Sequence, residues 1–443
     1  YHLGDENECW VDILPPGEKR QVNLTVVPQN GRRRLRVAWQ VTYDDAIDAE
    51  RSLTFADVVE FSEPDKPFQR IFPIPYVTGT PLKTDDVFVG REDVFAFIRE
   101  NLLGTHQNNV IVLHGQRRTG KTSVLYRLGE MMADTHYAVL VDMQGKPARG
   151  EADFLFSIAD DITFALEDRG VMIEPPRREE FAESPEFFFG SRFLRRLRAD
   201  LGEKNLLLMF DEFEELQRRV EDGRLQPEIF QFLRNLMQHE DRVDFVFSGT
   251  HKLEELGAEY WSILFNIASY KPITFLSAAD MRRLIEDPVA AYNLEYDPLA
   301  AERIIKVTAG HPYFAQLVLH EMVVYHNETQ RSYLTVMDVD RGLERIVGRG
   351  EAHFKFIWSE SSPEARIVLQ AMAELLVGQE TVNVTDMREF LDRHGYQSAD
   401  NWQQALTDLE GRDILTRQSA KSPLYRFKVD LIRLWIDRTR PSL

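Results

Sequence analysis

The sequence predicts an α/β fold with a parallel five-stranded sheet, and three observations indicate it. An apolar run at residues 110–113 leads into a glycine-rich turn that is followed by a helical pattern. A second apolar run, at 206–210, ends in two acidic residues. Helical patterns separate these runs from others of the same kind, which is typical of parallel strands joined by right-handed crossovers. The expected strands span residues 110–113, 138–142, 206–210, 245–248 and 273–275.

The glycine-rich turn has the phosphate-binding pattern G-x-x-x-x-G-K-[ST], known as the P-loop. It consists of Gly115, Gln116, Arg117, Arg118, Thr119, Gly120, Lys121 and Thr122, and Ser123 follows in a helix expected over 123–132. Its glycines let the backbone approach a phosphate, and the helix start offers free N–H groups. We expect Lys121 to neutralise the β- and γ-phosphates and Thr122 to hold Mg²⁺. For Arg117 and Arg118, contact with phosphates, contact with a neighbouring subunit and a solvent-facing position all stay open.

The acidic strand end supplies the second half of an NTP-hydrolysing site. Residues 206–210 are apolar throughout, as a strand buried on both faces requires. Asp211 and Glu212 follow at the carboxyl end, where open α/β sheets place their ligands. We expect Asp211 to hold the Mg²⁺ shell and Glu212 to polarise the attacking water. Glu214 and Glu215 are interpreted as a solvated helix start.

Composition limits the class of protein and the partners. The chain has 443 residues, enough for two to four domains, and a net charge of −19, which disfavours a general electrostatic grip on nucleic acid or an anionic membrane. Its single cysteine fits a reducing cytoplasm, and no apolar run approaches a membrane-spanning length. The histidines lack zinc-type spacing. Because the chain begins at Tyr1, we expect a further N-terminal effector module.

Four domains are expected. Residues 1–76 alternate apolar and polar residues at 22–26 and 35–43, which predicts an all-β, immunoglobulin-like interaction domain. The NTPase core covers 77–278 and includes an inserted helical segment at 154–200. Residues 279–361 are predicted to form an all-helical lid. From 362 to 443, three helical patterns, two strands at 414–418 and 424–427, and a final helix at 430–438 indicate a winged helix.

The winged helix raises the question of DNA binding. Residues 362–443 contain 11 Lys and Arg against 12 Asp and Glu, a net charge of −1. The expected recognition helix, at about 399–410, contains three acidic residues and no basic one. A helix that faces phosphates needs the opposite sign. We therefore favour docking within the chain or contact with protein over DNA binding, and we expect no membrane partner.

Taken together, these features resemble the STAND class of signal-transduction ATPases, in the prokaryotic branch allied to the AAA+ superfamily and the archaeal ATPases. The resemblance covers residues 85–443. It rests on Phe88-Val89-Gly90-Arg91-Glu92, the P-loop, the acidic strand, Ser248-Gly249-Thr250, Gly310-His311-Pro312 and the winged helix, in that order. The chain departs from the class at the sensor strand, where an arginine is common and the nearest basic residues are His251 and Lys252.

The resemblance implies further site residues. Val89, Gly90 and Arg91 match the segment that flanks the base and the phosphates, and Ser248 falls at the strand end that senses the γ-phosphate. Pro312 matches the lid proline that touches the adenine or reads the bound nucleotide. For His311, lid packing and phosphate sensing stay open. Arg234 and Arg242 are candidate positions for an arginine finger, with ordinary surface pairing as the alternative, and neither is assigned.

The resemblance also implies an activity and its regulation. In this class ADP locks the lid and winged helix onto the core, and ATP releases them so that the protein oligomerises. For this chain we expect protein partners or self-assembly through the NTPase core and the β domain, which the resemblance does not cover. The sequence thus predicts a slow ATPase switch in signal transduction, with prokaryotic defence as one setting. The alternatives are a DNA-acting ATPase of the initiator or transcription-regulator kind and a nucleotide-stabilised scaffold.

Overall fold

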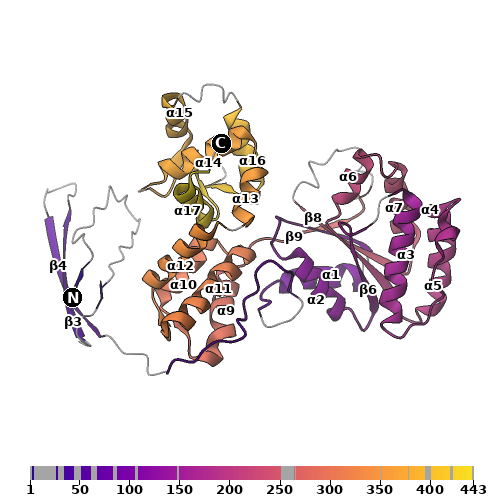
Figure 1. Cartoon of the computed structure of the whole chain (residues 1–443), viewed down its shortest axis with the longest axis horizontal. Helices are drawn as coiled ribbons and strands as arrows, with labels where there is room; N and C mark the ends of the chain where they lie inside the picture. The colour runs from indigo at the N-terminus through magenta and orange to yellow at the C-terminus, as the bar shows by residue number, and fades with distance from the viewer. Residues whose placement is uncertain are drawn as a thin grey trace. The chain divides into compact units, whose positions relative to one another are not determined.

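The computed structural model divides the chain into a first unit, Tyr1–Pro67, and a second unit, Phe68–Leu443 (Figure 1). The described residues are 2–3, 26–27, 34–43, 51–60, 67–82, 87–104, 108–146, 149–250, 264, 266–350, 352–377, 379–394, 401–419 and 423–441. Each unit is described by itself.

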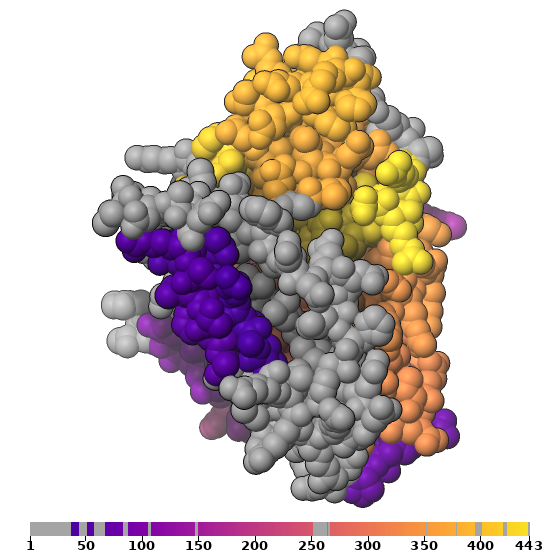
Figure 2. All heavy atoms as spheres, turned by 90° about the vertical axis from the view of Figure 1, so that its left-hand side faces the viewer, coloured from indigo at the N-terminus to yellow at the C-terminus, as the bar shows by residue number. Residues whose placement is uncertain are grey.

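The first unit contains an antiparallel hairpin of β3 (Arg34–Tyr43) and β4 (Arg51–Glu60), which faces the viewer in indigo in Figure 2. The short strands β1 (His2–Leu3) and β2 (Val26–Val27) also pair. The strand predicted at 35–43 is present, but Trp39 and Tyr43 are each 37% exposed and Val41 is 49% exposed. Its alternation therefore does not mark burial against a core. Most of the strand predicted at 22–26 lies outside the described residues, and the immunoglobulin-like fold stays a prediction.

The second unit is built on a five-stranded parallel sheet in the order β6-β7-β8-β5-β9. The strands are β5 (Val110–His114), β6 (His136–Asp142), β7 (Asn205–Asp211), β8 (Val243–Gly249) and β9 (Ser269–Pro272). The first strand in the chain, β5, thus lies between the last two. The connections after β5 and β8 leave the sheet in different directions, which opens a crevice at the carboxyl ends.

Helices cover both faces of this sheet (Figure 1). Val110 and Val112 pack towards α3 (Glu151–Glu167), α5 (Leu194–Asp200) and α7 (Glu228–His239). Ile111 and Leu113 pack towards α1 (Glu92–Leu103) and α2 (Lys121–Met131). Because successive side chains of a strand point to opposite faces, an unbroken apolar strand fills both layers.

The fifth strand is not where it was predicted. It spans Ser269–Pro272, whereas the sequence indicated 273–275. Because β9 lies at the edge of the sheet, its residues are exposed or half-buried, and they do not form the apolar run by which a buried strand is predicted. Pro272 ends the strand, and the apolar residues that follow divide between the core of the sheet, at Ile273, and the lid, at Phe275.

The segment predicted as a helical insertion is helical. It contains α3, a 3-10 turn at Arg178–Phe181, α4 (Pro185–Phe187), a π-helix at Phe188–Phe193 and α5. This segment contains three consecutive phenylalanines, at 187–189. Phe189 is buried, while Phe187 is 56% exposed, so these three residues are only partly core. A short helix, α6 (Glu215–Glu221), follows β7.

The lid consists mainly of helices. They are α9 (Ala278–Glu286), a 3-10 helix at Asp287–Tyr292, α10 (Pro298–Thr308), α11 (Pro312–Thr329), α12 (Val336–Arg349) and α13 (Ala352–Ser359). The prediction of an all-helical lid missed a short parallel pair, β10 (Glu295–Tyr296) with β11 (Tyr333–Leu334). Two residues per strand are too few for an alternating pattern to show.

The C-terminal segment combines helices with a three-stranded sheet. Its elements are α14 (Pro363–Leu375), β12 (Val382–Asn383), α15 (Val384–Arg393), α16 (Trp402–Gly411), β13 (Leu415–Arg417), β14 (Leu424–Phe427) and α17 (Asp430–Thr439). The sheet order is β12-β14-β13. The two predicted strands are present, and β12 is additional.

Lid and C-terminal segment share one hydrophobic core. Trp435 on α17 stacks on Phe354 of α13, with ring centroids 5.5 Å apart. Residues just after the first unit join this core too, since Ile71 and Tyr76 are buried in it and the Tyr76 hydroxyl donates to the carbonyl of Leu284. The boundary of the first unit accordingly lies at Pro67, ahead of the predicted residue 76. Among the described residues, no helix has the length and apolar character needed to cross a bilayer.

Candidate functional site

The P-loop connects β5 to α2 in the geometry that its sequence requires. Gly120, the residue before α2, has a φ of 93°, which glycine adopts without strain. At Gly115 a Cβ atom would lie 2.4 Å from the carbonyl oxygen of Ile273, so only glycine fits between the loop and the segment after β9. The first N–H groups of α2 therefore face the carboxyl edge of the sheet, where they can bind an anion.

Lys121 is buried, with 4% of its surface exposed. Its ammonium donates to the carbonyl oxygens of Gly115 and Gln116, at 3.0 and 2.8 Å. Burial lowers its pKa, while the charges of Glu212 and Glu214 raise it. A buried cation whose partners are mainly carbonyls is suited to neutralise an entering phosphate.

Thr122 and Asp211 meet across the sheet edge. The Thr122 hydroxyl donates to Asp211 Oδ2 at 2.5 Å, and Asp211 Oδ1 accepts the backbone N–H of Glu212 at 3.1 Å. A hydroxyl and a carboxylate oxygen in contact fit Mg²⁺, which takes one or two protein oxygens together with phosphate and water oxygens. Among the described residues, no group of three or more His, Cys, Asp or Glu side chains is placed to hold a metal ion alone.

Glu212 lies at the end of β7 in a constrained position. Its φ is 52°, a left-handed value that a non-glycine residue rarely adopts and that is often found at functional sites. Burial raises the pKa of Glu212 to about 7, and the charge of Glu214 adds to the rise. The prediction of a solvated Glu214 is wrong. This residue is 7% exposed and its Oε2 atom has no hydrogen-bond partner in the described part of the chain.

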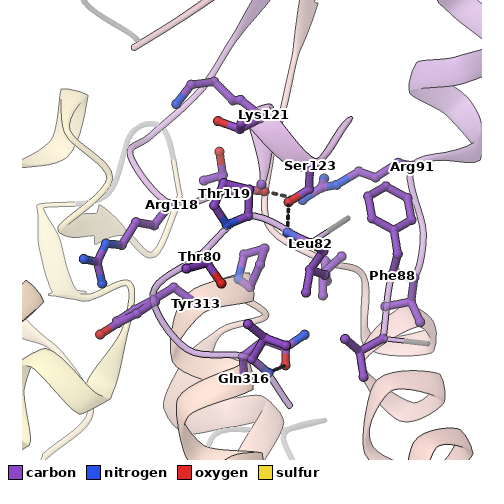
Figure 3. Close-up of a pocket in the computed structure, with 18 of the residues that line it drawn as sticks. Thr80, Leu82, Phe88, Arg91, Arg118, Thr119, Lys121, Ser123, Tyr313 and Gln316 are labelled. Carbon is purple, nitrogen blue, oxygen red and sulfur yellow. Dashed lines mark hydrogen bonds between the residues drawn. The ribbon is translucent and has the colours of Figure 1, made fainter. Parts of the chain in front are cut away.

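One cavity of about 200 Å³ joins these groups to the lid (Figure 3). Its lining includes Arg117, Arg118, Thr119, Gly120, Lys121, Thr122, Ser123 and Glu212 from the NTPase core, with Val89 and Arg91 before it and Pro312 from the lid. Gly90, Gly115, Gln116, Asp211 and Ser248 do not line it. Gly115 and Asp211 act behind the cavity surface through the contacts given above.

Gly90 has a φ of 72°, and a Cβ there would lie 2.9 Å from a carboxylate oxygen of Asp280. Ser248 is completely buried on β8, and its hydroxyl has no hydrogen-bond partner among the described residues. Arg91, with a φ of 76°, is itself buried and donates to the Thr119 carbonyl at 3.0 Å, which fastens this segment to the P-loop.

The strap of residues 77–82, which no sequence pattern indicated, forms one wall of the cavity. The backbone N–H of Val77 donates to Gln316 Oε1 on α11, at 3.1 Å, and that of Leu82 donates to Ser123 Oγ on α2, at 2.9 Å (Figure 3). The strap therefore bridges the lid and the NTPase core. Tyr313 and Gln316, one and four residues after Pro312, complete the wall from the lid. Helical spacing from Pro312 was the available signal for Gln316, four residues on, whereas Tyr313 had no such signal.

The Gly-His-Pro motif is explained by packing. Gly310 has a φ of 77°, and a Cβ there would lie 2.3 Å from the carbonyl oxygen of Leu276. Pro312 is the first residue of α11, a position that needs no N–H. His311 is 2% exposed, packs against Phe275 and Phe314, and leaves Nδ1 without a hydrogen bond in the described structure. Its burial favours the packing role.

Arg117 and Arg118 are exposed and lie over aromatic rings of the lid. The Arg117 guanidinium is 4.5 Å from the ring centroid of Phe356 on α13, and that of Arg118 is 4.2 Å from the ring centroid of Tyr313. Arg118 also has a left-handed φ, of 65°. The two candidates for an arginine finger form hydrogen bonds away from the cavity. Arg242 donates to the backbone carbonyls of Gly202 and Lys204, and Arg234 donates to the side-chain amide oxygen of Asn266.

Comparisons with known proteins agree with this geometry. The family model described as AAA domain matches residues 104–256. No curated protein matches the chain. Among solved structures, the Walker-type ATPase PABY2304 of Pyrococcus abyssi is similar, with a TM-score of 0.59 and 14% identity over 81% of this chain and 98% of that one. The Aeropyrum pernix ORC2 protein in its ADPNP–ADP complexes is also similar, with a TM-score of 0.52 and 16% identity. That match covers 85% of this chain and 100% of the ORC2 chain.

These findings identify an AAA domain within residues 104–256 and a fold shared with those two structures. At 14% and 16% identity the structural likeness shows fold alone.

Proposed function

We propose that this protein is an ATP-binding switch of the STAND kind, which hydrolyses ATP slowly, rests with ADP bound and changes its assembly when ATP replaces ADP. One observation supports this above all. The cavity lined by the P-loop and Glu212 is also lined by Pro312, Tyr313 and Gln316 of lid helix α11. A nucleotide in the cavity would contact the NTPase core and the lid at once, so its phosphate state can influence how the lid is held.

The residues supply the groups that phosphoryl transfer to water needs, which are mainly charge neutralisation and positioning. ATP, when bound, supplies the phosphoryl group. Lys121 neutralises phosphate charge, and Thr122 and Asp211 hold Mg²⁺. Glu212 orients the water and accepts its proton.

The shared core of the lid and the C-terminal segment supports a switch that moves as one body. If the C-terminal segment is a winged helix, it is fused to the lid through Trp435 and Phe354 and follows the lid when the nucleotide changes. Signal transduction, with prokaryotic defence as one setting, protein partners for the β domain and a cytoplasmic location belong to this proposal through the resemblance to the STAND class.

A DNA-acting ATPase is the second candidate, favoured by the likeness in fold to the Aeropyrum pernix ORC2 protein. The charges oppose it. Helix α16 has no Lys or Arg, and two basic residues nearby are paired, Lys428 with Asp413 and Arg433 with Asp430. A DNA-shift assay across a salt series separates the two functions. Salt-sensitive binding at modest protein concentration would favour the DNA-acting ATPase.

The first test of the switch is the nucleotide content of freshly purified, denatured protein, measured by chromatography. Near-stoichiometric ADP is the expected result. The control is Lys121→Ala, which removes the buried cation and is expected to be purified without nucleotide. An empty wild-type site would contradict the ADP-held resting state and would favour fast exchange or a DNA-dependent cycle.

A further inference from the structure

Three consecutive side chains at the tip of the P-loop contact the lid and the C-terminal segment. The Gln116 amide donates to the backbone carbonyl of Arg412, just after α16. The Arg117 guanidinium lies over Phe356, and that of Arg118 over Tyr313, towards which Figure 3 shows it extending. The P-loop thus also contacts the lid and the C-terminal segment, in addition to the bridge that the strap makes.

Both arginines also line the cavity. The positive charge of Arg117 acts on Lys121 and on Glu212, which places its guanidinium near the end of the site where the attacked phosphate must lie. Each guanidinium therefore has two alternative partners, an aromatic ring of the lid and the phosphate end of the cavity. Both side chains are exposed, so they can move between the two without unpacking a core.

The two kinds of partner differ in strength. A cation over an aromatic ring at an exposed site is a weak contact. A guanidinium on a phosphate forms charge-assisted hydrogen bonds that are often bidentate, and these are stronger. A third phosphate would therefore draw the arginines off the rings, while a diphosphate, whose charge Lys121 and the start of α2 already face, would leave them there.

We propose that Arg117 and Arg118 report the third phosphate by leaving the rings of Phe356 and Tyr313 for its oxygens, so that a triphosphate loosens the P-loop from the lid and the C-terminal segment. This inference rests on the proposed function, since it requires a nucleotide in the cavity. Tyr313 packs against the shared core of the lid and the C-terminal segment, and Phe356 lies on α13, whose Phe354 belongs to that core. Losing both ring contacts would therefore release the lid and the C-terminal segment together.

Phe356 gives the clearest test because it is half-buried and lies outside the cavity lining. Phe356→Leu removes the ring and keeps an apolar side chain, and Phe356→Tyr is the matched control that keeps the ring. Affinities for ADP and for a non-hydrolysable ATP analogue are measured by calorimetry on the full chain. For Phe356→Leu we expect the analogue to bind about two- to fivefold more tightly, as loss of one competing exposed cation–π contact implies. ADP affinity is expected to stay unchanged, and Phe356→Tyr to match the wild type.

A second measurement follows the movement itself. With Cys9 replaced by Ser, cysteines introduced at the exposed positions Asp160 on α3 and Glu389 on α15 carry a fluorescent donor and acceptor. The ATP analogue is expected to change the transfer efficiency and ADP to leave it as it is. Arg117→Gln combined with Arg118→Gln should make the efficiency the same with either nucleotide.

The outcomes separate this inference from the proposed function. If Phe356→Leu alters the affinities for the two nucleotides equally, or alters neither, the exchange of partners is wrong while nucleotide binding stands. If the wild type binds neither nucleotide, the proposed function fails and the exchange fails with it.

Discussion

Glu212 carries the most specific chemical assignment in the site. It follows the strand that places Asp211 in contact with Thr122, and its left-handed backbone conformation sets the direction in which the side chain leaves the main chain. Glu212→Gln keeps the size and removes the proton-accepting oxygen. We expect turnover to fall by about 10²- to 10⁴-fold, as loss of a general base implies, while ATP binding is retained. Single-turnover hydrolysis and nucleotide retention after gel filtration measure both. Hydrolysis at the wild-type rate would show that Glu212 is not the base.

His311 makes stability depend on pH. Its burial lowers the pKa to about 3, and the charge of Arg118 contributes. An unfolded chain has a histidine pKa near 6.5, so between these values the unfolded state binds more protons and stability falls as pH falls. Above pH 6.5 the contribution is fully present. Between pH 7 and pH 5 we expect the free energy of unfolding to drop by about 2 kcal/mol through this residue.

Urea unfolding at the two pH values tests this dependence. His311→Phe keeps a ring against Phe275 and Phe314 and removes the titrating group, so its loss of stability on acidification should be smaller by that amount. Burial also lowers the pKa of His353, so this residue too makes the protein less stable as the pH falls. An identical acid dependence in wild type and His311→Phe would contradict the assignment.

At the scale of elements, the close approach of the P-loop to the segment after β9 is a firm constraint. A methyl group at Gly115 would meet the carbonyl oxygen of Ile273 at 2.4 Å, and backbone atoms cannot give way as a side chain can. We expect Gly115→Ala to destabilise the protein by about 1–3 kcal/mol and to displace the loop, with loss of nucleotide affinity. Chemical denaturation and nucleotide titration measure the two effects.

Gly411 provides the matched control for that substitution. It ends α16, and an added Cβ would meet nothing within 4 Å. Gly411→Ala should leave stability unchanged or raise it by up to about 1 kcal/mol, because alanine favours the helix. If Gly411→Ala destabilised the protein as much as Gly115→Ala, the steric contact with Ile273 would not be the cause of the loss at Gly115.

Elements with a strong local signal were predictable from the sequence. The P-loop, the acidic strand and four of the five core strands depend on residues adjacent in the chain, so their patterns show directly. The edge strand β9 was misplaced because an edge needs no apolar run. The strap was missed because Val77 and Gln316 are 239 positions apart and neither residue type marks a site. The buried Glu214 was missed for the same reason, since only packing around α6 removes it from water.

For the whole molecule, the main consequence of the fold is that lid and C-terminal segment share a core, although the sequence divides them at residue 361. Trp435 is 4% exposed and lies against Phe354 and Trp358, at centroid distances of 5.5 and 6.2 Å. Its indole Nε1 has no hydrogen-bond partner in the described structure. The stacking therefore stabilises through burial and ring contact, with no contribution from a hydrogen bond.

Trp435→Ala is expected to cost about 3–5 kcal/mol, the range for deleting a large buried ring. Trp435→Phe keeps a ring on Phe354 and removes the unpaired N–H, so it should cost much less. Hydrogen exchange shows where the loss falls. If lid and C-terminal segment form one cooperative body, Trp435→Ala will lower amide protection in α10, α11 and α12 together with α14 and α17, and leave β5 and β7 protected. Loss confined to α14 and α17 would mean that the C-terminal segment opens alone, and a nucleotide signal in the lid would not have to move it.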